Sequence, residues 1–108
     1  MKIKILTIEG CNKCAKIKDF LKQSGLQYSE IPCESNSRDC DDAENVTSSY
    51  NYPVVILENE HTRKKEYIYE ESKYDSLRPS YLINENITLI PTYSVDGIVS
   101  WIKNKLNW

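Results

Sequence analysis

Two of the four cysteines form a Cys-x-x-Cys motif, and they are the residues best suited to do chemistry in this chain of 108 residues. Cys11 and Cys14 enclose Asn12 and Lys13, directly after a strand-like segment and at the start of a helix-like one. In that context the spacing is typical of thiol–disulfide chemistry. Helix N-terminal amides and the Lys13 charge favour the thiolate form of Cys11. We therefore predict that Cys11 is the nucleophile and Cys14 the resolving thiol that attacks a mixed disulfide.

The other two cysteines, Cys33 and Cys40, are separated by six residues and allow three interpretations. Together with the motif and the single histidine, His61, they supply enough ligands for zinc, although the spacing is unlike that of a zinc knuckle. A regulatory disulfide between them is the second interpretation. The favoured interpretation is two ordinary free cysteines, so we predict no metal site and assign neither thiol to the active site.

Hydrophobic periodicity predicts alternating strands and helices around the motif. Gly25 stands where the first helix would end, and Ser94 stands where the last helix would begin. The predicted strands are 2–8, 26–32, 52–58 and 65–70, with 87–90 as a competitor for the fourth position. The predicted helices are 12–24, a short one within 34–51, and one from 94 to about 106. We expect the first two strands to pair in parallel and the third and fourth to form a hairpin.

Composition and charge exclude several classes of protein. The formal net charge is -2, and fourteen Lys and Arg are spread among sixteen Asp and Glu, which argues against a nucleic-acid partner. No apolar run approaches the roughly 20 residues of a membrane helix, and the first residues lack a signal-peptide core. We expect a single domain over residues 1–108, a monomer in the reducing cytoplasm with no membrane or nucleic-acid partner.

The order of these elements, the Cys11-Asn12-Lys13-Cys14 motif and Pro53 at the start of the third strand resemble the glutaredoxin family of the thioredoxin superfamily. The resemblance covers most of the chain. It implies an α/β thioredoxin fold in its minimal form, β-α-β-α-β-β-α, with a central four-stranded mixed sheet flanked by helices. It also implies a thiol–disulfide oxidoreductase that reduces protein or glutathione mixed disulfides, with glutathione as co-substrate and no bound cofactor.

The resemblance further implies which residues bind the substrate. In the family, the proline that matches Pro53 is cis and lies against the motif, and the residue before it pairs its backbone with the substrate. Two positions between the cysteines depart from the usual Pro-aromatic pair, and the usual basic residue before the motif is absent. The turn before the last helix matches the family only in part. The predicted substrate-binding residues are Asn12, Lys13, Tyr52, Pro53, Ser94 and Asp96.

The stretch 59–92 is longer than the family needs between the third strand and the last helix. Its tyrosines 67, 69, 74 and 81 support two interpretations: a wall beside Cys11 that selects a protein substrate, or side chains that fill the edge of the core. Two other functions are open. One is a non-catalytic binding module that uses the Tyr52-Pro53 edge, and the other is a zinc or iron–sulfur protein.

Overall fold

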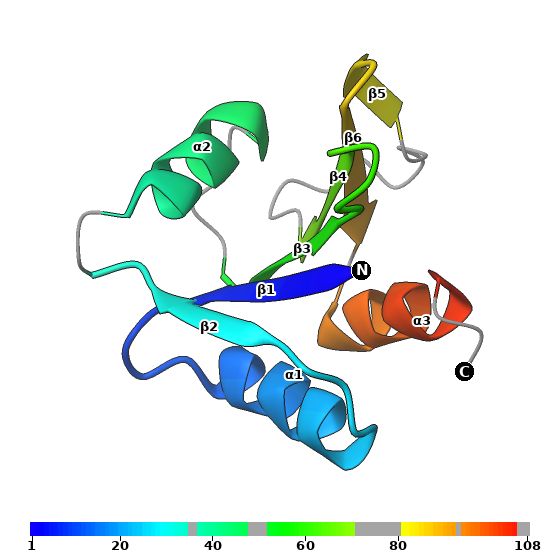
Figure 1. The fold of residues 1–108 in the computed structure, drawn as a ribbon. Coiled ribbons are helices and arrows are strands. Elements are labelled where there is room, and N and C mark those ends of the chain that lie inside the picture. Colours follow the sequence, from blue (N-terminus) through cyan, green and yellow to red (C-terminus); the bar gives the residue numbers. More distant parts are fainter. Residues whose placement is uncertain (35–36, 48–51, 71–80, 93, 106–108) are drawn as a thin grey trace.

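A computed structural model describes residues 1–34, 37–47, 52–70, 81–92 and 94–105 and shows three helices around one mixed sheet in this part of the chain (Figure 1). The sheet has the order β2-β1-β3-β4-β6-β5. Its strands are β1 (Lys2–Thr7), β2 (Ser29–Pro32), β3 (Val54–Glu58), β4 (Lys65–Glu70), β5 (Tyr81–Asn84) and β6 (Ile87–Thr92). The helices are α1 (Asn12–Gln23), α2 (Arg38–Thr47) and α3 (Val95–Lys105).

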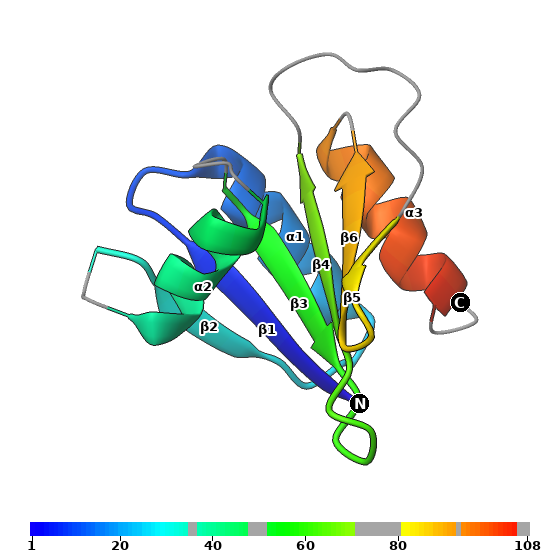
Figure 2. The same cartoon turned by 90° about the horizontal axis from the view of Figure 1, so that it is seen from above.

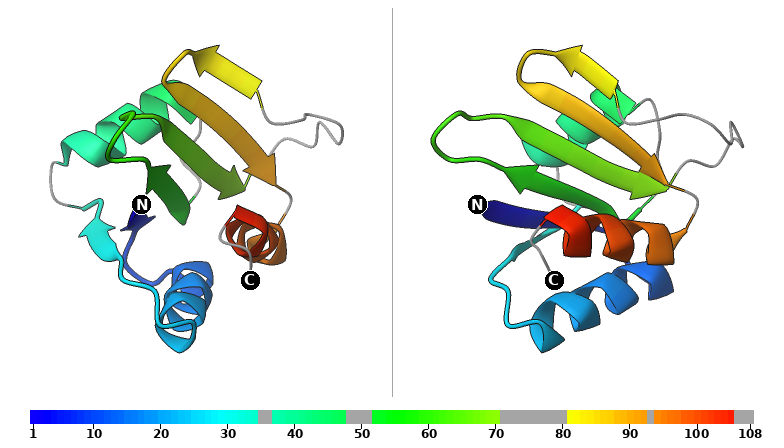
Figure 3. Two further views of the ribbon diagram at one scale, coloured as in Figure 1. Left: turned by 45° about the vertical axis from the view of Figure 1, so that its right-hand side comes forward. Right: turned by 90° about the vertical axis from the view of Figure 1, so that its right-hand side faces the viewer.

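The predicted pairings are confirmed, and the sheet is wider than predicted. β1 pairs in parallel with β2, and β3 pairs antiparallel with both β1 and β4. The segments 65–70 and 87–90, which we considered as competitors for one strand position, both form strands. β6 adds to β4 in parallel, and β5 adds antiparallel to β6 at the edge (Figure 3). The predicted sheet of four strands is therefore corrected to six.

Both faces of the sheet are covered, because the strand residues alternate between two cores. One core joins Ile5, Val55 and Ile68 of the sheet to buried residues of α1 and α3, including Ile17 and Ile98. The opposite core joins the other faces of the same strands to α2. Its buried members are Leu6, Cys40, Ala43, Val54, Ile56, Tyr67, Tyr69 and Leu89. Figures 1 and 3 show α1 and α3 together on one face and α2 alone on the other.

Helix α1 ends one residue before its predicted end, and its C-cap explains why β2 begins later than predicted. Gly25 adopts a positive φ of 70°, and its N–H donates to the Lys22 carbonyl. The Leu26 N–H donates to the Leu21 carbonyl at 3.1 Å, which completes a Schellman motif. Because Leu26 is used to close the helix, the strand begins at Ser29 rather than at residue 26 as predicted.

The strand directions place the starts of all three helices at one edge of the sheet. β1, β2, β4 and β6 all run the same way, and β3 runs against them. The carboxyl ends of β1, β2 and β6 lead into α1, α2 and α3, and the start of β3 lies at the same edge (Figure 2). Among the described residues, no helix is both long and apolar enough to cross a membrane.

Candidate active site

Cys11 is the residue that precedes α1, and its sulfur is held by the first turn of that helix. Gly10 before it has a φ of +73°, a conformation that favours glycine. Cys11 itself is extended, and its Sγ accepts a hydrogen bond from the Cys14 N–H at 3.0 Å. A sulfur in this position accepts from an otherwise unsatisfied helix amide, which stabilises negative charge on it. The geometry therefore favours a thiolate at Cys11 when the pair is reduced.

Cys11 and Cys14 form a disulfide, with their Cα atoms 5.2 Å apart. The two sulfurs differ in access to solvent: Cys11 is partly exposed, whereas Cys14 is 2% exposed. An incoming thiol or disulfide can therefore reach Cys11 directly, while Cys14 is shielded within the first turn. This asymmetry is what a two-thiol cycle requires of an attacking and a resolving cysteine.

The start of β3 lies against the Cys11 sulfur. The Tyr52–Pro53 peptide bond is cis, and the Tyr52 carbonyl oxygen lies 3.9 Å from Cys11 Sγ. The Tyr52 hydroxyl donates to Glu44 Oε1 at 2.8 Å, which anchors this residue to α2. Burial, followed by that hydrogen bond and nearby carboxylates, raises the pKa of Tyr52 above its ordinary value. The hydroxyl is thus a neutral anchor, and the backbone at Tyr52 is fixed beside the sulfur.

Lys13 does not stand free beside the thiol. Its Nζ lies 2.8 Å from both carboxylate oxygens of Glu70, the last residue of β4. We predicted that the Lys13 charge would favour the Cys11 thiolate and bind substrate. The ion pair partly offsets that charge at close range, and the substrate-binding role of Lys13 stays a prediction. Sequence reasoning missed Glu70, since 57 residues separate it from Lys13.

A groove of about 550 Å³ opens beside Cys11 and carries more acidic than basic side chains. Of the predicted substrate-binding residues, Asn12 lines it. Lys18 is its basic residue, and its Nζ lies 3.3 Å from Glu30 Oε2. The residues that line the groove are Thr7, Ile8, Glu9, Gly10, Cys11, Asn12, Cys14, Lys18, Glu30, Pro32 and Glu34. Parallel pairing of β1 and β2 brings these segments together, and this is the signal that could have identified Glu30 and Glu34.

Ser94 and Asp96 lie at the start of α3, at the same sheet edge but outside this groove within the described structure. The Ser94 Oγ accepts the Gly97 N–H at 3.2 Å, so it caps the helix as the sequence predicted. Asp96 lies in the first turn, where its negative charge interacts favourably with the positive end of the helix dipole. The structure thus gives both residues a role in α3 itself.

Two of the four tyrosines of the stretch 59–92 have described side chains, and neither of them forms the wall that we considered. Tyr67 and Tyr69 are 2% and 0% exposed, and both pack in the core beneath α2. Burial and then the charges of nearby carboxylates raise the pKa of Tyr67 to about 12. Tyr74 and the Tyr81 side chain lie outside the described residues. The two tyrosines that are described therefore support the second interpretation, that of filling the core.

Cys33 and Cys40 form a second disulfide, with their Cα atoms 5.8 Å apart. The favoured interpretation of two free cysteines is therefore wrong. β2 ends beside the beginning of α2, and this tertiary contact brings the two thiols together. Both disulfides divide the four thiols into separate pairs, and among the described residues no group of three or more His, Cys, Asp or Glu side chains could hold a metal.

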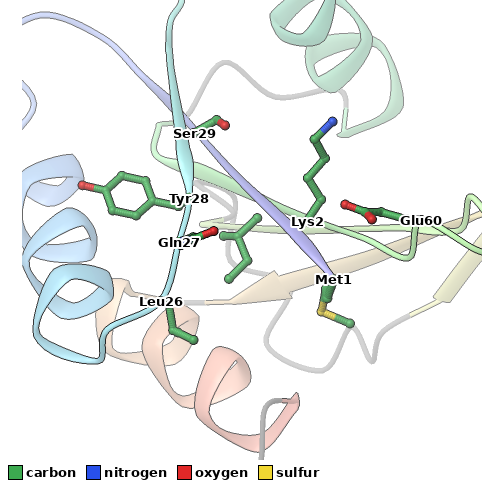
Figure 4. Close-up of a pocket in the computed structure, with 8 residues that line it drawn as sticks. Met1, Lys2, Leu26, Gln27, Tyr28, Ser29 and Glu60 are labelled. Carbon is green, nitrogen blue, oxygen red and sulfur yellow. The ribbon is translucent and has the colours of Figure 1, made fainter.

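A larger pocket of about 600 Å³ lies at the opposite edge of the sheet, where β1 begins (Figure 4). Its lining includes Lys2, Tyr28, Ser29 and Glu60 and contains no thiol. Figure 4 shows the Tyr28 ring directed toward α1, with Lys2 and Glu60 on the other side of β2. The chemistry of the cysteine motif is therefore confined to the smaller groove at the carboxyl end of β1.

Comparison with known proteins finds one similar curated sequence and similar solved structures. The Gene 56 protein of Mycobacterium phage L5 is 26% identical over 83 residues, which are 77% of this chain and 78% of that protein. The solution structure of glutaredoxin from Brucella melitensis has a TM-score of 0.53 at 15% identity, covering 99% of this chain and 85% of that one. The crystal structure of the thioredoxin-like protein BC3987 is 27% identical with a TM-score of 0.47, covering 52% of this chain and 77% of that one.

The family model described as Glutaredoxin matches residues 3–62, more than half of the chain. The match contains both halves of the site: the Cys11–Cys14 pair at the start of α1, and the Tyr52–Pro53 bond that lies beside it. The sheet flanked by helices on both faces is the thioredoxin fold expected from the sequence, widened by β5 and β6. The fold, the cysteine pair and the family model agree, and the chain belongs to the glutaredoxin family.

Proposed function

We propose that this protein is a thiol–disulfide oxidoreductase that reduces disulfides of protein substrates or glutathione mixed disulfides. The observation that carries the proposal is the Cys11 sulfur, which is partly exposed and accepts the Cys14 N–H at 3.0 Å. Such a sulfur is both reachable and stabilised as a thiolate, and these are the two properties of an attacking thiol. The family membership supports the same chemistry.

The proposed cycle uses the two thiols in turn. The Cys11 thiolate attacks one sulfur of the substrate disulfide, and the other sulfur leaves as a thiolate that takes a proton. Cys14 then loses its proton to solvent and attacks Cys11 Sγ, which releases the second substrate sulfur. The product is the Cys11–Cys14 disulfide seen in the structure. Two glutathione thiols, or another thiol donor of the cytoplasm, return the two electrons.

The Tyr52 backbone is proposed to orient the substrate. Its carbonyl oxygen lies 3.9 Å from Cys11 Sγ, so an extended segment that pairs with this edge would place its own disulfide at the sulfur. Backbone pairing is independent of side chains, and this suits a protein substrate. We assign Asn12 a contact to the same segment, because it lines the groove beside Cys11.

The charges around the site favour a protein disulfide over glutathione as the preferred substrate. Glutathione carries two carboxylates and would gain from a free cation near the thiol. Lys13 is paired with Glu70, and Lys18 is paired with Glu30. Glu9 and Glu34 add two further carboxylates to the groove. We therefore propose that glutathione acts mainly as the electron donor and binds weakly.

The test compares two reductions in the wild type and three variants. Turnover of hydroxyethyl disulfide with glutathione and glutathione reductase measures glutathione-linked chemistry, and reduction of insulin by dithiothreitol measures dithiol chemistry. We expect the wild type to be active in both, Cys11→Ser to be inactive in both, and Cys14→Ser to lose insulin reduction only. Lys16→Ala, an exposed change on the same helix, is the matched control and keeps both activities. Equal activity of wild type and Cys11→Ser would refute the proposal.

A further inference from the structure

The two parallel strands β1 and β2 are followed by the same arrangement of cysteines. After β1 comes the partly exposed Cys11, which is bonded to Cys14 in the first turn of α1. After β2 comes the partly exposed Cys33, which is bonded to the buried Cys40, the third residue of α2. Because the strands are parallel, β1 and β2 end at the same edge of the sheet, and each disulfide follows directly after one of them (Figure 2).

The second disulfide is tied to the wall of the Cys11 groove. The Cys33 N–H donates to the carbonyl oxygen of Thr7, the last residue of β1, at 2.8 Å. The next residue, Glu34, accepts the Glu9 N–H with its carboxylate and lines the groove together with Cys11. The covalent bond from Cys33 to α2 therefore fixes the segment that carries Glu34 against the active site.

The two disulfides differ in the electrostatics of their exposed sulfurs. Cys11 Sγ accepts an amide N–H, whereas Cys33 Sγ lies 3.7 Å from the Ile31 carbonyl oxygen. A carbonyl oxygen disfavours a thiolate, while an amide favours it. Cys33 is thus a poor attacking thiol, and its partly exposed sulfur can still be attacked when it is in a disulfide.

We propose that Cys33–Cys40 is a second reducible site, the substrate of an external dithiol, and that its reduction opens the Cys11 groove. One thiolate of the dithiol attacks Cys33 Sγ, the Cys33–Cys40 bond breaks, and Cys40 takes the electron pair and a proton. The second thiol of the reductant then attacks the mixed disulfide and releases Cys33. Two electrons pass from the dithiol, which leaves as a disulfide, and the segment that carries Glu34 loses its disulfide crosslink to α2.

Reducibility is tested without the active-site thiols. The variant Cys11→Ser/Cys14→Ser is equilibrated in mixtures of reduced and oxidised dithiothreitol, where circular dichroism follows the fold. Samples are then quenched with acid, alkylated in denaturant so that the buried Cys40 is also labelled, and mapped by peptide mass spectrometry. We expect Cys33 and Cys40 to become alkylated together in one two-electron transition while the protein stays folded. If they become alkylated only when the circular dichroism signal of the fold is lost, the pair is a purely structural crosslink and the inference is overturned.

Coupling to the groove is tested in Cys14→Ser, where Cys11 is the free thiol. The rate of its reaction with iodoacetamide is compared between the protein with Cys33–Cys40 oxidised and the same protein carrying Cys33→Ser/Cys40→Ala. We expect the second to react at least about threefold faster, because a groove carboxylate moves away from the sulfur. Glu34→Gln in Cys14→Ser keeps the disulfide and tests the same contact if the other variant does not fold.

Equal alkylation rates in all three proteins would overturn the coupling. The idea that this coupling controls turnover rests on the proposed function, whereas the two measurements above do not. A protein that shows both effects and yet fails to reduce hydroxyethyl disulfide or insulin would refute the proposed function and leave this inference standing. An active protein whose Cys33–Cys40 disulfide cannot be reduced would support the proposed function and overturn this inference.

Discussion

Removing the Cys33–Cys40 crosslink should lower the free energy of unfolding by about 2 kcal/mol. The two cysteines are seven positions apart in the sequence. Closing a loop of that length removes roughly 8 cal/mol/K of entropy from the unfolded chain, which is about 2 kcal/mol at 25 °C. For a domain of this size, that corresponds to a fall in melting temperature of about 10 °C.

The assay isolates this crosslink from the active-site one. Urea denaturation followed by circular dichroism is run on Cys11→Ser/Cys14→Ser with and without a dithiol reductant. In this background the reductant acts on Cys33–Cys40 alone. The matched control adds Cys33→Ser/Cys40→Ala, where the alanine avoids placing a hydroxyl at a position that is 3% exposed. We expect the reductant to destabilise the first protein and to leave the second unchanged.

The reasoning would be refuted by a change below about 0.5 kcal/mol in the first protein, because the loop-closure model then fails for this pair. A difference of equal size in the control would be as damaging, since the reductant would then act on something other than the crosslink. The loss of unfolding free energy on reduction should agree between urea denaturation and thermal denaturation.

Three further predictions follow from contacts near the site. Glu70→Gln releases the Lys13 ammonium and should lower KM for a glutathione mixed disulfide about twofold in the hydroxyethyl disulfide assay, as expected for a half-exposed ion pair. Adding Lys13→Ala should cancel this gain. Ser94→Ala removes the acceptor of the Gly97 N–H and should cost about 1 kcal/mol in thermal unfolding, and no loss would contradict its capping role. Burial raises the pKa of Tyr67 to about 12, so the stability contributed by its neutral hydroxyl is present below pH 10 and is lost between pH 10 and 12. In urea titrations, Tyr67→Phe should therefore reduce the fall in the free energy of unfolding over this pH range.

The sequence was sufficient for whatever depends on near neighbours in the chain. The Cys11–Cys14 pair, its position between a strand and a helix, and the cap at Ser94 are each decided within one or two helical turns. The parallel pairing of β1 and β2 also followed from the sequence, because a strand, a short helix and a strand connect in few ways. Together with Pro53 and the order of the elements, they predicted the family and the position of the Cys11–Cys14 pair at the start of a helix.

The tertiary structure decided which distant residues meet. Spacing along the chain does not say that Cys33 pairs with Cys40, because their approach depends on where α2 packs against the sheet. Nor does it say that Glu70 reaches Lys13, since the end of β4 is brought to the start of α1 by two strand pairings. The sequence left two interpretations of Tyr67, a wall beside Cys11 or a side chain that fills the core, and only the packing of α2 selected the second. Local pattern thus determined the chemistry of the site, and long-range packing determined the charges and the second crosslink that surround it.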